Sequence, residues 1–212
     1  MGERLDYVLY YKGIPAASAH LALQRADSAS ALITFRTRTR TLWSTLFRIN
    51  NVYRTWIEIK SGEPLRSEKD VEQKNIRQRL EVDYDRDSHT VRCADKWEFS
   101  LPAGCLDMLA LIHRLRIEPT EPGDELNLWL HIEGQLWRAR GRCTALEQER
   151  RKTSFSFEWG GGLKHRDWKT DLLTNRLVRE GSVLEIVSGS GNRPVRISFG
   201  DEVEMRLRDR ED

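Results

Sequence analysis

GCLDMLALIHRLR, from Gly104 to Arg116, is the stretch of sequence that decides how the rest of the chain is interpreted. Its apolar residues recur at intervals of three and four, which places them on one face of an α-helix. Pro119 and Pro122 follow, and proline cannot continue the helical hydrogen bonds. The spacing therefore predicts one amphipathic helix over Gly104–Arg116, with a buried stripe made of Cys105, Met108, Leu109, Ile112 and Leu115.

Outside this stretch the apolar residues mostly alternate with polar ones, which is typical of strands with one covered face. Glu133-Gly134 separates two alternating segments and predicts a tight hairpin turn. Leu65–Asn75 is polar throughout and favours a solvated or edge strand. We expect an all-β, mostly antiparallel protein. Its curled sheet would form an open barrel or β-roll, and the helix would pack on the concave side or cap one end.

Length and charge limit the classes of protein to consider. The 212 residues show no internal repeat or linker, so we expect a single domain over 1–212, ordered from about 5 to 207, with a charged tail over 208–212. The net charge is only +2 and acidic and basic residues are interspersed, which argues against a nucleic-acid binder. The sequence contains no run of 18 apolar residues, so it predicts no membrane-spanning helix. The strand-like opening fits either a cytoplasmic chain or an exported one whose leader has been removed.

Several short segments occur in a characteristic order: Tyr10–Ala17, Leu46–Asn51, Ile57–Ile59, Val82–Asp85, Cys105–Arg116 and Asn192–Ile197. Their order and spacing resemble the bacterial family catalogued as domain of unknown function 3108, from about Leu5 to Leu207. The resemblance implies an envelope protein, periplasmic or otherwise exported, with a curled antiparallel sheet. It implies no established activity, no cofactor and no catalytic residues. Two features depart from the family: Ala17, where glycine is usual, and the segment Lys164–Glu180.

Three arginines, Arg36, Arg38 and Arg40, are a candidate ligand-binding row. Residues two apart in a strand share a face and lie about 7 Å from each other. Such a row could bind phosphates or acidic sugars. The interpretation we favour is structural: acidic residues on a neighbouring strand would pair with the arginines across the sheet.

Three tryptophans, Trp43, Trp56 and Trp129, fall opposite the main apolar face of their segments. A second apolar face in a curled sheet would form a groove for a lipid, a glycan or a peptide. We therefore count these three residues, with the arginine row, as candidate ligand contacts.

No motif in the sequence identifies a reaction. The five histidines are widely spaced and no C-x-x-C motif is present, so we expect neither a metal nor another cofactor. Cys105 is expected to be a buried, inert thiol. A disulfide between Cys93 and Cys143 is a possible pairing but not the expected one.

Two functional hypotheses follow. The first is a non-catalytic binding or scaffold module of the cell envelope, whose partner is a lipid, a glycan or an envelope protein. The second is a hydrolase-like enzyme with an unrecognised site in the sheet concavity, where His113 and Asp107 would converge with the arginines. The sequence leaves the oligomeric state open.

Overall fold

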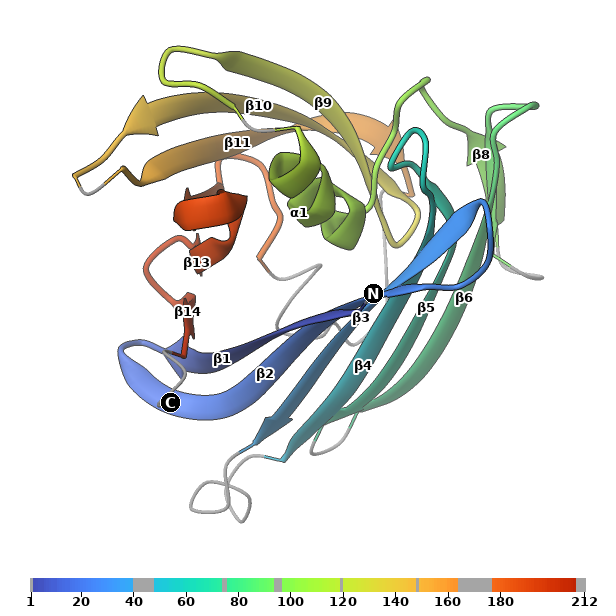
Figure 1. The fold of residues 1–212 in the computed structure, drawn as a ribbon. Helices are drawn as coiled ribbons and strands as arrows, with labels where there is room; N and C mark the ends of the chain where they lie inside the picture. The colour runs from blue at the N-terminus through green and yellow to red at the C-terminus, as the bar shows by residue number, and fades with distance from the viewer. Residues whose placement is uncertain are drawn as a thin grey trace.

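The computed structural model of the chain describes residues 2–39, 48–73, 76–93, 97–118, 120–147, 149–163 and 177–208. Strands dominate the described residues, which also contain one α-helix and a short 3-10 helix (Figure 1). In chain order the elements are β1 (Glu3–Tyr11), β2 (Ile14–Arg25), β3 (Ser30–Thr39), β4 (Ile49–Glu58), β5 (Pro64–Gln73), β6 (Ile76–Asp85), β7 (Thr90–Cys93), β8 (Trp97–Ser100), α1 (Met108–Ile117), β9 (Glu125–Ile132), β10 (Gln135–Ala145), β11 (Arg151–Gly162), β12 (Val183–Ser188), η2 (Ser190–Asn192), β13 (Pro194–Phe199) and β14 (Val203–Leu207).

The strands form a single sheet of 14 strands within the described residues. Chain neighbours pair antiparallel from β1 to β8 and again from β9 to β14. β1 also pairs antiparallel with β14, which joins the two halves, with Tyr7 opposite Leu207. β8 and β9 are the two edges, so the sheet is not closed into a barrel. The predicted antiparallel, curled sheet is confirmed, and Figure 1 shows it bending around α1.

Alternating burial explains why these segments are strands. Leu5, Tyr7 and Leu9 of β1 are buried, whereas the residues between them are partly exposed. The same alternation places one side chain in two on the inner face of the curled sheet. These inner side chains form the main hydrophobic core together with those of α1.

The helix begins later than predicted. Asp107 is its N-cap, and the Asp107 carboxylate accepts a hydrogen bond from the backbone N–H of Ala110 at 2.8 Å. The predicted start at Gly104 is wrong because Gly104 has a left-handed φ of +71° and Leu106 instead bridges to Leu130 of β9. Cys105 is therefore buried ahead of the helix and not on its stripe.

α1 lies on the concave side of the sheet, as one of the two predicted placements had it, and contacts β3, β4 and β9. The predicted stripe residues within the helix, from Met108 to Leu115, are buried. Ala110 and Leu111, which lie off that stripe, are 0% exposed. A helix that is covered on nearly all sides lies within a core, so α1 is an internal element of the roll.

The two ends of the sheet overlap where β9 meets β6–β8. Leu130 of β9 belongs to the main core, whereas its neighbours Trp129 and His131 point to the opposite face. The His131 ring packs at 5.3–5.7 Å against the rings of Tyr84, Trp97 and Phe99. Both faces of β9 are therefore covered at this end, and the sheet is a roll. A second, smaller core fills the overlap, formed by Leu80, Val82, Tyr84, Val91, Cys93, Leu101, Cys105 and Leu136.

β5 corrects one expectation about the sheet. Its polar sequence predicted a solvated or edge strand, but β5 pairs along its length with both β4 and β6. Lys69 and Gln73 point inward and are buried on either side of Val71. The prediction failed because polar side chains occupy inner positions of this strand, where Lys69 finds a charged partner inside the roll.

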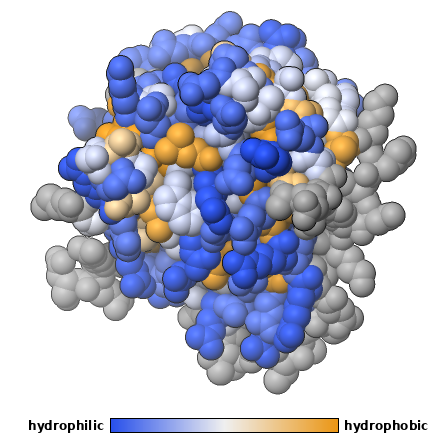
Figure 2. All heavy atoms as spheres, turned by 90° about the vertical axis from the view of Figure 1, so that its right-hand side faces the viewer, coloured by the Kyte–Doolittle hydropathy of each residue, from blue (hydrophilic) through white to orange (hydrophobic). Residues whose placement is uncertain are grey.

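The outer faces of the neighbouring strands carry ion pairs. Arg54 of β4 pairs with Glu68 of β5 at 3.4 Å, and Arg66 of β5 pairs with Glu81 of β6 at 2.9 Å. Figure 2 shows that the corresponding side of the molecule is mainly hydrophilic, with apolar side chains in small separate groups. This distribution leaves the inner face as the main apolar surface of the sheet.

Candidate functional site: the interior cavity

A cavity of about 100 Å³ lies between α1 and the inner face of the sheet. The rows that face it follow from the strand register of β3–β6, because residues opposite each other on neighbouring strands line up across the sheet. Two such rows contribute to the cavity region. They are Phe35–Tyr53–Lys69–Leu80 and Ile33–Thr55–Ser67–Val82, and every residue of these rows except Ile33 lines the cavity.

The apolar wall of the cavity comes from both the helix and the sheet. Met108, Leu109 and Ile112 of α1 face Phe35 of β3 and the residues of β6. Their side chains are at most 9% exposed. Most of the cavity surface is therefore apolar, which suits a hydrocarbon group.

A buried ion pair lies at one side of the cavity. Lys69 of β5 pairs with Glu133, whose side chain comes from the hairpin turn between β9 and β10. The two side chains are only 7% and 5% exposed. The turn at Glu133-Gly134 is confirmed, and Glu133 adopts a left-handed φ of +49° there. Removing one partner of such a pair would leave an uncompensated buried charge.

His131 makes a second polar contact across the overlap. Its Nε2 accepts a hydrogen bond from the backbone N–H of Gly134 at 2.8 Å. In the neutral ring the proton then resides on Nδ1, which lies 2.9 Å from the Tyr84 hydroxyl. Burial raises the pKa of Tyr84 well above its ordinary value, with Asp107 contributing, so this phenol stays protonated. The contact joins β9 to β6.

Asp107 connects the helix to the sheet at the cavity wall. The Thr55 hydroxyl donates to the Asp107 carboxyl at 2.6 Å, while the carboxyl also caps α1. Burial raises the pKa of Asp107, and the hydrogen bonds from Thr55 and the helix backbone oppose that rise. The two contacts fix the start of α1 against β4.

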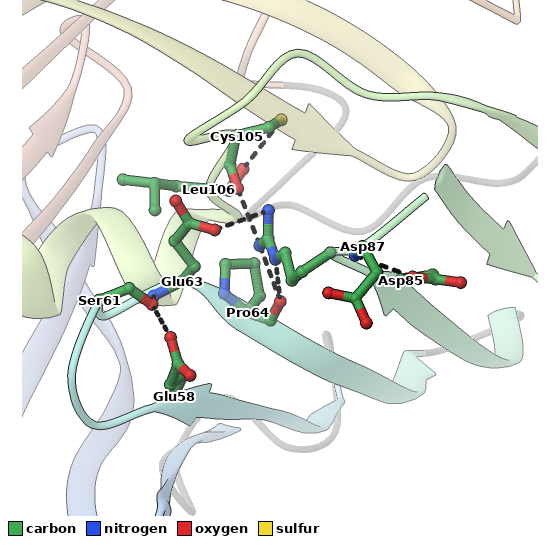
Figure 3. Close-up of polar contacts among 9 residues, drawn as sticks. Glu58, Ser61, Glu63, Pro64, Asp85, Asp87, Cys105 and Leu106 are labelled. Carbon is green, nitrogen blue, oxygen red and sulfur yellow. Dashed lines mark hydrogen bonds and ion pairs between the residues drawn. The ribbon is translucent and has the colours of Figure 1, made fainter. Parts of the chain in front are cut away.

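Arg86 secures the chain that leads into the helix. Its guanidinium donates to the carbonyl oxygens of Pro64 at 2.7 Å and Cys105 at 3.1 Å, and pairs with Glu63 at 3.2 Å. Figure 3 shows these partners converging from the turn before β5 and from the segment before Leu106. Arg86 thus connects the start of β5 to the segment that leads into α1.

The structure places the predicted arginine row on the outer surface. Arg36 and Arg38 are exposed on β3, and Arg40 lies outside the described residues. The acidic neighbours we expected are not there: Arg36 lies opposite His20 and Val52, and neither arginine forms an ion pair with a described residue. They face away from the interior cavity.

The three tryptophans do not come together into one groove among the described residues. Trp43 lies outside them, and Trp56 is half-buried on the outer face, with the guanidinium of Arg66 5.8 Å from its ring centre. Trp129 packs on the second core, and its indole lies over the backbone of Gly160. Trp129 is thus the one described candidate near the overlap of the two sheet ends.

The groups named for the enzyme hypothesis do not converge. Asp107 binds Thr55 at the start of α1, whereas His113 lies near Glu3 and Arg116, and its pKa is lowered by burial and by Arg116. In the part of the chain that the structure describes, no three His, Cys, Asp or Glu side chains form a group suited to a metal ion. None of the helices there is long and apolar enough to cross a membrane.

All three cysteines, Cys93, Cys105 and Cys143, are buried in the structure. The less favoured disulfide between Cys93 and Cys143 is not formed. Burial raises the pKa of the Cys105 thiol to about 12, so this thiol is protonated at neutral pH and is a poor nucleophile.

Sequence reasoning missed the residues that surround the cavity. Thr55, Lys69 and Tyr84 occupy inward positions of alternating strands, and Glu133 was identified only as a turn residue. A polar residue on the covered face of a strand was the available signal, because such a residue needs a partner inside the fold. The sequence does not identify the partner of each polar residue, because the partner depends on which strands overlap at the two ends of the sheet.

The structure is similar to a crystal structure from Brucella abortus, described as a β-barrel-like protein of domain of unknown function DUF1849. The TM-score is 0.58 and the alignment covers 97% of this chain and 95% of that chain, at 8% sequence identity, so the likeness concerns the fold alone. No curated protein matches the chain. Residues 6–207 match the family described as "Protein of unknown function (DUF3108)", and the chain therefore belongs to that family.

Proposed function

We propose that this protein is a non-catalytic binding module of the bacterial envelope, which takes one slender apolar or amphipathic chain into the cavity beside α1. The cavity itself carries the proposal. It is a mostly apolar space, lined by residues that include Phe35, Leu80 and Ile112, which the described side chains do not fill. The envelope location rests on the family resemblance.

The size of the cavity favours a narrow ligand. At about 100 Å³ it is smaller than the sites that enclose whole drug-sized molecules, which are roughly 300–1,000 Å³. A single unbranched alkyl chain matches it better than a ring system or a two-chain lipid. Burying six methylene groups at about 0.8 kcal/mol each gives roughly 5 kcal/mol, which corresponds to a dissociation constant on the order of 0.1–1 mM.

Calorimetric titration of the delipidated protein with hexyl β-D-glucoside tests the proposal. We expect saturable binding of one molecule per chain. Ile112→Phe places a larger side chain in the cavity and should abolish the binding heat, because Ile112 is 6% exposed and lines the cavity. Val52→Phe on the outer face of β4 is the matched control and should bind as the wild type does.

Circular dichroism spectra and thermal melts identify variants that fail to fold. If Ile112→Phe does not fold, Val82→Leu narrows the same cavity by one methylene and should weaken binding. The absence of binding heat in the wild type would overturn the proposal. Unchanged binding in a folded, cavity-filled variant would overturn it as well.

A further inference from the structure

A row of polar side chains lies on the inner face of the sheet, next to the cavity. Thr37 of β3 is opposite Asn51 of β4, Asn51 is opposite Val71 of β5, and Val71 is opposite Gln78 of β6. Gln73 follows Val71 on the same face of β5. We call Thr37, Asn51, Gln73 and Gln78 the inner polar row.

Thr37, Asn51 and Gln73 are buried and Gln78 is half-buried, and each has a buried polar atom without a hydrogen bond. Thr37 and Asn51 are each 1% exposed and Gln73 is 5% exposed. The Thr37 hydroxyl, Asn51 Oδ1, Gln73 Nε2 and Gln78 Oε1 have no hydrogen-bond partner within the part of the chain that the structure describes. Asn51 makes one contact, from its Nδ2 to the Tyr53 hydroxyl at 3.1 Å.

Four such atoms in one place require an explanation. A buried polar atom without a partner costs free energy, because it gives up its hydrogen bonds to water. Apolar residues at the same positions would avoid that cost, as Val71 does between Asn51 and Gln78. Clustered polar atoms of this kind point to a missing polar partner.

The inner polar row continues the wall of the cavity. Thr37, Asn51 and Gln78 each lie two residues from a neighbour in the Phe35–Tyr53–Lys69–Leu80 row, which faces the cavity. Two residues along a strand span about 7 Å. A hydrocarbon chain in the cavity would therefore bring a head group attached to its end within reach of the row.

We propose that the inner polar row binds an uncharged, hydroxylated head group, such as a sugar or glycerol, on the ligand whose chain fills the cavity. This inference rests on the proposed function and names the ligand class for the same site. The proposal rests on the position of three residues next to the apolar cavity. Thr37, Asn51 and Gln73 are each more than nine-tenths buried, and each has a polar atom without a hydrogen bond.

Hydroxyl groups match the row better than charged groups do. A hydroxyl both donates and accepts, so it satisfies the amides of Asn51 and Gln73 in either orientation. The row contains no charged side chain, and the nearest inward charge, Lys69, already pairs with Glu133. An ionic head group would be desolvated there without a counter-charge.

Calorimetry with three ligands that share a hexyl chain tests the head-group preference. The ligands are hexyl β-D-glucoside, hexanoate and hexyltrimethylammonium. The wild type should bind the glucoside about tenfold more tightly than either ion, which is the effect of one net hydrogen bond. Thr37→Val and Gln73→Met should each lower glucoside affinity about tenfold while leaving hexanoate binding unchanged. Thr34→Val, on the outer face of β3, is the matched control and should change neither affinity.

Thermal melts of the ligand-free variants distinguish a ligand site from a structural water network. Thr37→Val removes an unpaired buried hydroxyl, so its Tm should equal or exceed that of the wild type. Equal binding of all three ligands would overturn the head-group assignment and leave the proposed function standing. A lowered Tm in both Thr37→Val and Gln73→Met with an unchanged glucoside preference would also overturn it. Failure of every hexyl ligand to bind would overturn the proposed function itself.

Discussion

Asp107 links the start of the helix, the sheet and the cavity. Its carboxyl begins α1, accepts the Thr55 hydroxyl and borders the cavity. An aspartate before an apolar run is a sequence signal for the start of a helix, but the apolar spacing extends through Cys105 and moves the predicted boundary back to Gly104. Only the left-handed Gly104 and the bridge of Leu106 to β9 place the start at Met108.

The raised pKa of Asp107 makes a pH-dependent prediction. Because the folded pKa lies above the ordinary value of 3.8, the folded state binds the proton more tightly than the unfolded state does. The resulting stabilisation is complete below about pH 4 and is lost as the pH rises through the folded pKa. The wild type should therefore lose stability relative to Asp107→Asn between about pH 4 and about pH 7.

Urea unfolding of the wild type and Asp107→Asn at both ends of that range measures the difference. Asparagine keeps the capping oxygen but does not ionise, so it is the appropriate reference. A difference in unfolding free energy that does not change with pH would contradict the assignment.

Gly141 is a second residue whose role is apparent only in the structure. It lies opposite Phe155 on β11, and a Cβ atom at Gly141 would lie 2.4 Å from the Phe155 ring. Because Phe155 is 0% exposed, the ring has no free space in which to move. We predict that Gly141→Ala destabilises the protein by about 1–3 kcal/mol, measured by urea unfolding. Ser156→Ala on the exposed side of β11 should stay within about 0.5 kcal/mol of the wild type, and an equally mild Gly141→Ala would refute the close contact.

At the scale of elements, the sequence predicted α1 and the alternation of the strands but not their full surroundings. The three- and four-residue spacing identified the buried stripe because that face packs on the core. It could not identify the burial of Ala110 and Leu111, which depends on the sheet curling around the helix. The prediction for β5 is wrong for a related reason. A lysine in a strand predicts a solvent-exposed position, but Lys69 is buried because it pairs with Glu133 from a distant turn.

The burial of α1 predicts a contrast between two helix positions. Leu111 is 0% exposed, and Leu111→Ala should destabilise the protein by about 2–5 kcal/mol through lost contacts and the cavity left behind. Ile117 is 48% exposed at the end of the helix, and Ile117→Ala should cost no more than about 0.5 kcal/mol. Thermal or urea unfolding of both variants measures the contrast, and similar effects at the two positions would show that α1 is not enclosed.

At the scale of the whole molecule, contacts between distant parts of the chain hold the roll together. Lys69 and Glu133 are 64 positions apart, and Tyr84 and His131 are 47 apart. Period-two patterning predicts which side chains face inward, but it does not specify which strand edges come to overlap. The cavity and its polar neighbours arise from that overlap, so the candidate site could not be located from the sequence.

A double-mutant cycle tests the role of the Lys69–Glu133 pair in the roll. Lys69→Met should cost about 3–5 kcal/mol, because it leaves the Glu133 carboxylate buried without its counter-charge. Adding Glu133→Gln removes that charge and should recover a large part of the loss. Urea unfolding of the two single variants and the double variant gives the coupling free energy, and additive losses would show that the two residues act independently.

The most direct test of the central claim, that the space between α1 and the sheet holds a ligand chain, is a methyl NMR titration with hexyl β-D-glucoside. The account predicts saturable chemical-shift changes at Leu80, Val82, Met108 and Ile112, which line the cavity, and none at Val52 on the outer face. Changes confined to outer methyl groups, or none at all, would contradict it.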